Sequence, residues 1–145
     1  MHKNFRRQQR GESRLGETVR IASIVQKGLV TGRSSYVEMN ALDRLTNHNI
    51  KAKVSALKKL PKLEVELEDF LMKIPHAVSG GYTKVLTPNG IVKENELGQL
   101  LSIDAEIVTY LGMIEQGKAQ KMRDVFDALK ELVEERNKLI DSLRA

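Results

Sequence analysis

The sequence predicts a mainly α-helical protein, in which a basic N-terminal arm and a helical hairpin precede a small helical bundle with a possible short β-hairpin or extended loop. Apolar residues recur at spacings of three and four along most of the chain, which is typical of amphipathic helices. Turn-forming residues are concentrated in residues 76–93. The length of 145 residues suits one modest domain with tails, and the absence of cysteine excludes disulfide frameworks and thiolate metal sites.

Residues 1–16 carry too little apolar surface to fold by themselves. They contain five Lys and Arg side chains and one acid, Glu12, while the sizeable apolar side chains are Met1, Phe5 and Leu15. Burial of so few groups cannot offset a backbone entropy cost of roughly 1–2 kcal/mol per residue. We therefore expect a basic arm that becomes ordered only against a partner.

Two helices joined by a short turn are predicted next. Residues 17–29 place aliphatic side chains on one face at intervals of four, and glycines follow this segment. Residues 36–47 continue the helical pattern after turn and N-cap residues at 32–35. Together these segments predict a helical hairpin.

A basic amphipathic stretch follows a weak interruption of the helical pattern at residues 47–49. Ile50, Val54 and Leu57 restore the helical spacing, and four lysines flank them. The stretch lacks the Trp and Phe side chains that anchor helices at a membrane surface. The phosphate backbone of a nucleic acid is therefore the better partner for it.

The helix predicted over residues 61–74 has a competing interpretation as a strand. Pro61 suits the first turn of a helix, and Pro75 is expected to end it. Residues 63–68 alternate between apolar and charged side chains, as in a half-exposed strand. We favour the helix because the apolar pattern continues to Ile74 with helical spacing, where the alternation fails.

Residues 76–93 are predicted to form a short β-hairpin or an extended loop. Turn residues at 79–81 and 87–90 accompany two short runs, 82–86 and 91–93. An isolated hairpin is only marginally stable in water. We therefore expect this segment to pack on the helices or on a neighbouring subunit.

The two clearest helices are predicted over residues 94–116 and 122–143. The first is apolar around most of its circumference and should be the central helix, while the second has apolar residues at spacings of three and four. Gly117 is expected to close the first helix, and the two should form an antiparallel pair. The helix at 61–74 would be a third member of the bundle, and a fourth must come from residues 17–60 or from another copy.

The sequence indicates no catalytic, metal or cofactor site, and we expect a protein that is not an enzyme. His2, His48 and His76 are dispersed, with no further ligand at the spacing of a metal site. The glycines in residues 28–34 have neither the spacing nor the lysine of a phosphate-binding loop. Asp104 interrupts the apolar surface of the central helix, and a boundary position or a hydrogen bond to a partner chain explains it better than catalysis.

The distribution of charge divides the chain near Pro61. Residues 1–61 carry a net charge of +9 and residues 62–145 a net charge of −4. Clustered cations repel one another unless phosphates or counterions neutralise them. We therefore expect a nucleic-acid-facing arm and hairpin over 1–61, with contacts mainly to phosphates, and a bundle for folding and assembly over 62–145. The expected nucleic-acid-binding residues are Lys3, Arg6, Arg7, Arg10, Arg14, Arg20, Lys27, Arg33, Lys51, Lys53, Lys58 and Lys59.

The order of these parts resembles that of the coat proteins of filamentous archaeal viruses. Those proteins are small and helical, with basic N-terminal helical arms that embrace DNA and a compact C-terminal bundle that packs against neighbours. The resemblance is architectural and leaves residues 76–93 without a counterpart. It implies paired coat subunits, wrapped double-stranded DNA and a virion location. By position, it also implies a DNA-facing role for Arg6, Arg7, Arg10, Arg14, Arg20 and Lys27.

We therefore expect a structural protein that binds nucleic acid, self-assembles and packages or coats DNA, in the virion if it is coat-like and otherwise in the cytoplasm. No membrane span is expected, because the aliphatic runs are far shorter than the roughly 20 residues that cross a bilayer. Two alternatives stay open. One is a DNA-binding regulator or small helical subunit of a ribonucleoprotein complex, and the other is a protein-binding scaffold or chaperone.

Overall fold

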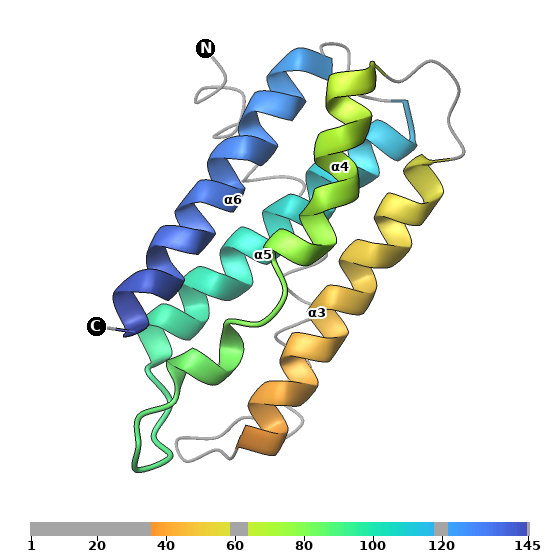
Figure 1. Cartoon of the computed structure of the whole chain (residues 1–145). Coiled ribbons are helices and arrows are strands. Elements are labelled where there is room, and N and C mark those ends of the chain that lie inside the picture. The colour runs from red at the N-terminus through yellow and green to blue at the C-terminus, as the bar shows by residue number, and fades with distance from the viewer. Residues whose placement is uncertain (1–35, 59–63, 118–121, 145) are drawn as a thin grey trace.

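The computed structural model (Figure 1) describes residues 36–58, 64–117 and 122–144. Within these ranges it contains four α-helices and one short 3-10 helix, which confirms the mainly α-helical class. The expected arm, the helix at 17–29 and the turn at 32–35 lie outside the described residues. The elements in chain order are α3 (Tyr36–Leu57), α4 (Val65–Ala77), η2 (Tyr82–Val85), α5 (Glu94–Glu115) and α6 (Met122–Arg144).

Helix α5 is the central helix of the bundle, as the sequence predicts. It packs against α3 and α6, while α4 contacts α3 and α6 from the other side (Figure 1). Helices α5 and α6 run antiparallel, and Gly117 follows α5 with a positive φ of 67°. The predicted antiparallel pair is therefore confirmed, and α3 supplies the fourth helix.

Helix α5 is also long and apolar enough to cross a bilayer, judged by length and composition alone. No other helix in the described ranges meets that test. Of the residues in the most apolar stretch of α5, 56% are buried inside the bundle. The central helix of a helical bundle needs the same apolar surface, so this property follows from its place in the core.

Helix α3 is continuous through residues 47–49, so the predicted interruption is wrong. Thr46 and Ile50 are buried on one face, and the side-chain amide of Asn47 donates a hydrogen bond of 3.1 Å to the carbonyl of Pro75. Asn and His have helix propensities only a few tenths of a kcal/mol poorer than those of good helix formers. Burial of the neighbouring side chains against α4 and α5 outweighs that cost.

Helix α4 confirms the helical interpretation, although its described start is Val65 and residues 59–63 are outside the described ranges. Pro75 was predicted to end the helix, but α4 continues past it to Ala77. A proline this close to the C-terminus removes one backbone donor without interrupting a long stretch of hydrogen bonds. The N–H of Val78 then donates to the carbonyl of Ile74 at 3.0 Å and closes the last turn.

The segment between α4 and α5 contains less β-structure than a hairpin would. Tyr82–Val85 is a 3-10 helix, and one antiparallel bridge joins Leu86 to Val92. The side chains of Tyr82 and Val85 are both fully buried. A 3-10 turn places residues three apart on the same side, whereas a strand would place them on opposite sides. Burial of this pair therefore favours the 3-10 turn, and the remainder is a loop.

Candidate nucleic-acid interface

One face of α3 presents a row of cations to solvent. Arg44 and Lys51 of α3 and Lys58, which directly follows its last residue, lie at intervals of seven, and His48 lies between the first two. All four side chains are exposed. At 1.5 Å per residue the row is about 21 Å long, because 14 residues separate its ends. We call these four residues the α3 cationic row.

The α3 cationic row is not neutralised by acids in the part of the chain that the structure describes. The two acidic side chains of α3, Glu38 and Asp43, are only partly exposed. None of the four row side chains forms an ion pair within 4.0 Å among the described residues. The charges of Arg44, Lys51 and Lys58 are therefore available to an external polyanion.

The sequence prediction of the interface is only partly covered by the described residues. Lys51 and Lys58 are exposed as expected, whereas Lys53 points to α5, where its Nζ lies 3.4 Å from Oε2 of Glu115. Arg44 was not among the expected residues, although its spacing of seven from Lys51 places it on the same helical face. The expected residues outside the described ranges are Lys3, Arg6, Arg7, Arg10, Arg14, Arg20, Lys27, Arg33 and Lys59.

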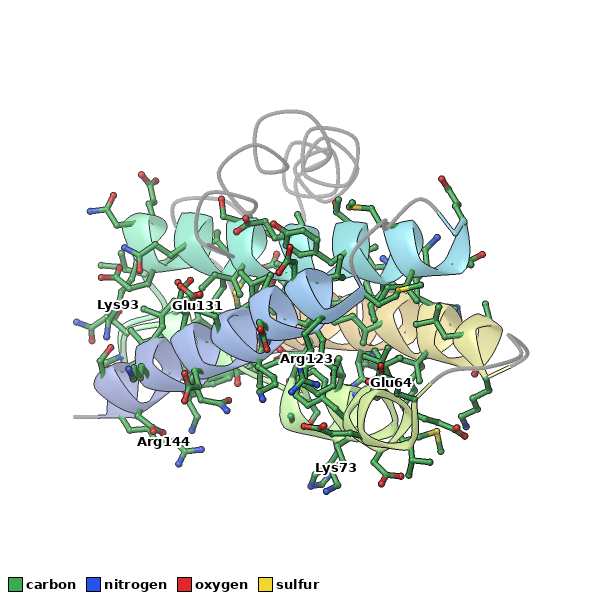
Figure 2. The ribbon with its side chains drawn as sticks, turned by 90° about the horizontal axis from the view of Figure 1, so that it is seen from above. Glu64, Lys73, Lys93, Arg123, Glu131 and Arg144 are labelled. Atoms are coloured by element: carbon green, nitrogen blue, oxygen red, sulfur yellow. The ribbon has the colours of Figure 1, made fainter. Side chains whose placement is uncertain are left out.

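The outer surfaces of α4 and α6 differ from this row because acids and bases are mixed on them. Glu64 and Lys73 both project from the region of α4, and Arg123 lies on α6 where it faces α4 (Figure 2). An exposed ion pair of 3.3 Å joins Arg123 Nη1 to Glu66 Oε2. A surface of mixed sign creates a weaker field at a distance than a row of one sign.

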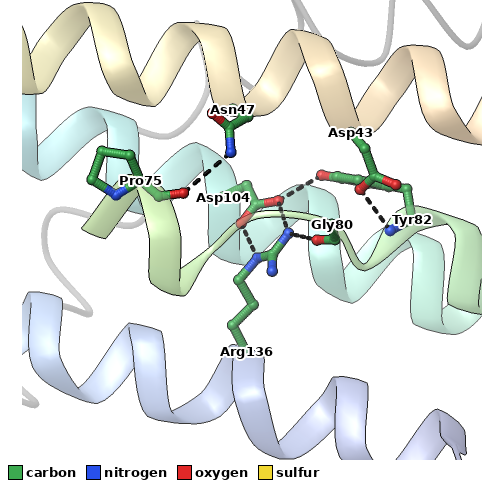
Figure 3. Close-up of polar contacts among 7 residues, drawn as sticks. All are labelled: Asp43, Asn47, Pro75, Gly80, Tyr82, Asp104 and Arg136. Atoms are coloured by element: carbon green, nitrogen blue, oxygen red, sulfur yellow. Dashed lines mark hydrogen bonds and ion pairs between the residues drawn. The ribbon is translucent and has the colours of Figure 1, made fainter. Parts of the chain in front are cut away.

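A buried ion pair lies behind the cationic row, between α5 and α6. The Nε of Arg136 donates to Oδ1 of Asp104 at 2.7 Å, and its Nη2 lies 3.3 Å from Oδ2 (Figure 3). The side chains are 1% and 0% exposed. Tyr82 donates its hydroxyl to Oδ2 of Asp104 at 2.8 Å, and the carbonyl of Gly80 accepts from Nη2 of Arg136 at 2.6 Å. We call these four residues the buried polar network.

Burial and charge act in opposite directions on this network. Burial raises the pKa of Asp104, while the guanidinium of Arg136 and the hydroxyl of Tyr82 oppose that rise. Burial lowers the pKa of Arg136, but the Asp104 carboxylate, together with Tyr82 and Asp43, outweighs it and leaves the pKa above its usual value. Burial and the adjacent carboxylate both raise the pKa of Tyr82, so its hydroxyl keeps its proton and remains a donor. The two-point contact fits a charged guanidinium.

The buried polar network is connected to α3 through the backbone of η2. The N–H of Tyr82 donates to Oδ1 of Asp43 at 2.9 Å, and the N–H of Thr83 lies 3.4 Å from Oδ2 (Figure 3 shows the first contact). Burial raises the pKa of Asp43, and these backbone hydrogen bonds oppose the rise. The helix that carries the cationic row is thus joined by hydrogen bonds to the segment that Asp104 and Arg136 hold.

Sequence reasoning noticed Asp104 but not its partner. The expectation of a boundary position or a partner-chain hydrogen bond is not what the structure shows, since the carboxylate is fully buried and bonded within its own chain. Arg136 was missed, although it lies three residues after Val133 and four before Ile140, on the apolar face of α6. An acid, Asp104, and a base, Arg136, interrupt the apolar faces of two helices that were expected to pair. That combination is a signal for a buried ion pair.

The described residues contain no group of three or more His, Asp or Glu side chains placed to hold a metal ion. His48 and His76 lie on different helices, α3 and α4, and His2 is outside the described residues. Comparison of the chain with protein-family models, curated proteins and solved structures finds no match.

The buried pair should show strong energetic coupling. We expect Asp104→Asn or Arg136→Met alone to lower the free energy of unfolding by about 3–5 kcal/mol, because each leaves an uncompensated buried charge. The double variant should be more stable than the sum of the single effects predicts, by about 1–3 kcal/mol. Urea denaturation of the four proteins measures this. The exposed pair of Arg123 and Glu66 is the control, and equal coupling in both cycles would contradict our account.

Two adjacent glycines provide a test of how closely η2 approaches α6. A methyl group on Gly81, which has φ 118°, would lie 2.9 Å from Cδ1 of Ile140 and 3.2 Å from Nη2 of Arg136. Gly80 also has a positive φ, 76°, but a methyl group there meets nothing within 4 Å. We expect Gly81→Ala to destabilise the fold by about 1–3 kcal/mol more than Gly80→Ala, because only Gly81 adds overpacking to backbone strain. Equal midpoints in thermal unfolding would show that the close approach is absent.

Proposed function

We propose that this protein is a non-enzymatic, nucleic-acid-binding structural protein that self-assembles and packages or coats DNA. The α3 cationic row carries this proposal. It offers three permanent cations along about 21 Å of a helix, with no acid interposed on the exposed face. Phosphate groups supply the dominant, sequence-independent part of nucleic-acid affinity. Such a row is suited to contacts with a phosphate backbone rather than with base edges.

The charge of the chain beyond the described residues supports the same function. Residues 1–61 have a net charge of +9, and α3 accounts for only part of it. The resemblance to coat proteins of filamentous archaeal viruses adds the expectation that the N-terminal cations and the α3 row act on the same DNA. In that case the protein is a virion component that acts as paired or repeated subunits.

Self-assembly needs surfaces that a second copy can cover. Val65 and Met72 lie seven residues apart on α4 and are 75% and 47% exposed. Single exposed apolar side chains are ordinary, but residues seven apart share one face of a helix. This face supports an assembly role for the bundle, separate from the α3 cationic row.

The α3 row can be tested by removing charge at matched positions. We expect the triple variant Arg44→Gln, Lys51→Gln and Lys58→Gln to bind duplex DNA more weakly. Its plot of log affinity against log salt should be shallower by about 2–3, because about 0.9 is lost per phosphate contact. The control removes one Arg and two Lys from exposed positions on α4 and α6, as Lys73→Gln, Lys138→Gln and Arg144→Gln. Fluorescence anisotropy over a salt series measures both.

The outcomes of that titration separate the candidate functions. A shallower slope in the α3 variant alone supports the proposal. The same decrease in both triple variants would mean that net charge acts without the row, and would contradict the interface. An absence of DNA binding by the unmodified chain would instead favour a protein-binding scaffold.

Assembly should be visible directly. We expect the full chain with long duplex DNA to form filaments in negative-stain electron microscopy, because each copy neutralises a short length of DNA and neighbouring copies can contact one another along it. Digestion of the DNA with nuclease before the protein is added should prevent these filaments. Discrete particles of fixed size on long DNA would contradict a coat function and favour the regulator or the small ribonucleoprotein subunit.

A further inference from the structure

Three residues of the α3 cationic row line a hollow in the protein surface. The hollow has a volume of about 400 Å³ and lies between α3 and the turn that precedes η2. This volume falls within the range of about 300–1,000 Å³ that is usual for small-ligand sites. Its lining residues are Asp43, Arg44, Asn47, His48, Lys51 and Gly80.

Three of the lining side chains can donate hydrogen bonds to an anion. Arg44, His48 and Lys51 are spaced by four and three residues, so each is a neighbour of the next on the helix surface. A guanidinium can hold two oxygens of a phosphate at once, and a lysine ammonium adds a compact point charge. The imidazole of His48 has at least one N–H donor in either protonation state.

Two acceptors that could repel an anion in this hollow, the Asp43 carboxylate and the Gly80 carbonyl, accept hydrogen bonds from the same chain. The carboxylate of Asp43 accepts from the N–H groups of Tyr82 and Thr83 at 2.9 and 3.4 Å. The carbonyl of Gly80 accepts from Arg136 Nη2 at 2.6 Å, toward the core. Arg44, His48 and Lys51 are exposed, whereas the Asp43 carboxylate and the Gly80 carbonyl are used in the fold.

The charge of Asp43 would still weaken an anion site, since this carboxylate lies beside Arg44. The buried guanidinium of Arg136 reduces that effect, because it adds a positive charge on the inner side of Asp43. Against one partly buried carboxylate, Arg44 and Lys51 supply two permanent cations at the surface.

We propose that this hollow is a phosphate-binding pocket, in which Arg44, His48 and Lys51 hold one phosphate group of a nucleic-acid backbone. The nucleic-acid source rests on the proposed function, whereas the recognition of a phosphate group does not. Lys58 is on the same row but lies outside the pocket and contributes charge alone.

The pocket can be tested with inorganic phosphate as a probe of the full chain. We expect saturable shifts of the Arg44, His48, Lys51 and Gly80 signals in two-dimensional NMR spectra, at constant ionic strength set with sodium chloride. Arg44→Gln should weaken the apparent affinity for phosphate about tenfold or more, since it removes hydrogen bonds between charged groups. Lys51→Gln should weaken it as well. Lys138→Gln, which removes one exposed charge from α6, is the matched control and should leave it unchanged.

A parallel titration with a short DNA duplex identifies the source of the phosphate. Shifts at the same four residues, with a larger loss of affinity in Arg44→Gln than in Lys58→Gln, support the proposal in full. Phosphate shifts spread over all cationic surfaces, or equal effects of Arg44→Gln and Lys138→Gln, overturn the pocket even where salt-dependent DNA binding remains. Saturable phosphate binding without any DNA binding supports a phosphate pocket but overturns both the nucleic-acid source and the proposed function.

Discussion

The buried ion pair of Asp104 and Arg136 is the interaction on which the arrangement of the other elements depends. Removing two such charges from water costs several kcal/mol for each ion, so the pair persists only where further partners satisfy it. Tyr82 and Gly80 provide those partners. The Nη1 of Arg136 finds none among the described residues, which increases the cost of burial. An apolar pair of the same volume would meet no such cost. The directional contacts instead fix how α5 and α6 face each other and where the η2 segment must lie.

This constraint extends from the core to the exposed face of α3. The hydroxyl of Tyr82 reaches Asp104 while its backbone N–H reaches Asp43, so one residue connects α5 with α3. Helix α3 is also held by three fully buried side chains, Met39, Leu42 and Ile50. Because the rotation of α3 about its axis is fixed from within, the residues of its outer face are fixed as well. The cationic row is thus a rigid feature of the fold, although each cation is exposed.

The sequence predicted the long helices well because their stability comes from their own periodic apolar faces. Helices α5 and α6 begin and end close to the predicted positions, and Gly117 follows α5 as expected. The incorrect predictions lie where contacts between segments distant in the sequence determine the local structure. The hydrogen bond from Asn47 to the Pro75 carbonyl joins residues 28 apart, and both the continuity of α3 and the extension of α4 occur at this contact. Likewise, the 3-10 turn follows from the burial of Tyr82, which local alternation does not reveal.

In the candidate interface, too, features that depend on helical spacing could be predicted, whereas features that depend on contacts between distant residues could not. Lys51 and Lys53 were both predicted to bind nucleic acid. Side chains two residues apart on a helix point in directions that differ by about 200°, so Lys53 faces α5 and Glu115. Arg44 lies on the face of Lys51 by periodicity and could have been found from its spacing. The partner of Asp104 could not be found from spacing alone. It required knowing which residues of two antiparallel helices lie at the same level.

Under the proposed function, nucleic-acid binding and self-assembly depend on each other for an energetic reason. A row of three permanent cations neutralises only a few phosphates, and an affinity built on so few contacts falls steeply with salt. Contacts between neighbouring copies make later binding events effectively intramolecular, which increases the total affinity without any new phosphate contact. A long polyanion in turn holds the copies at high local concentration. A fixed α3 face therefore has a role beyond charge: it sets the same phosphate contact in every copy, so neighbouring subunits meet the polymer in equivalent positions.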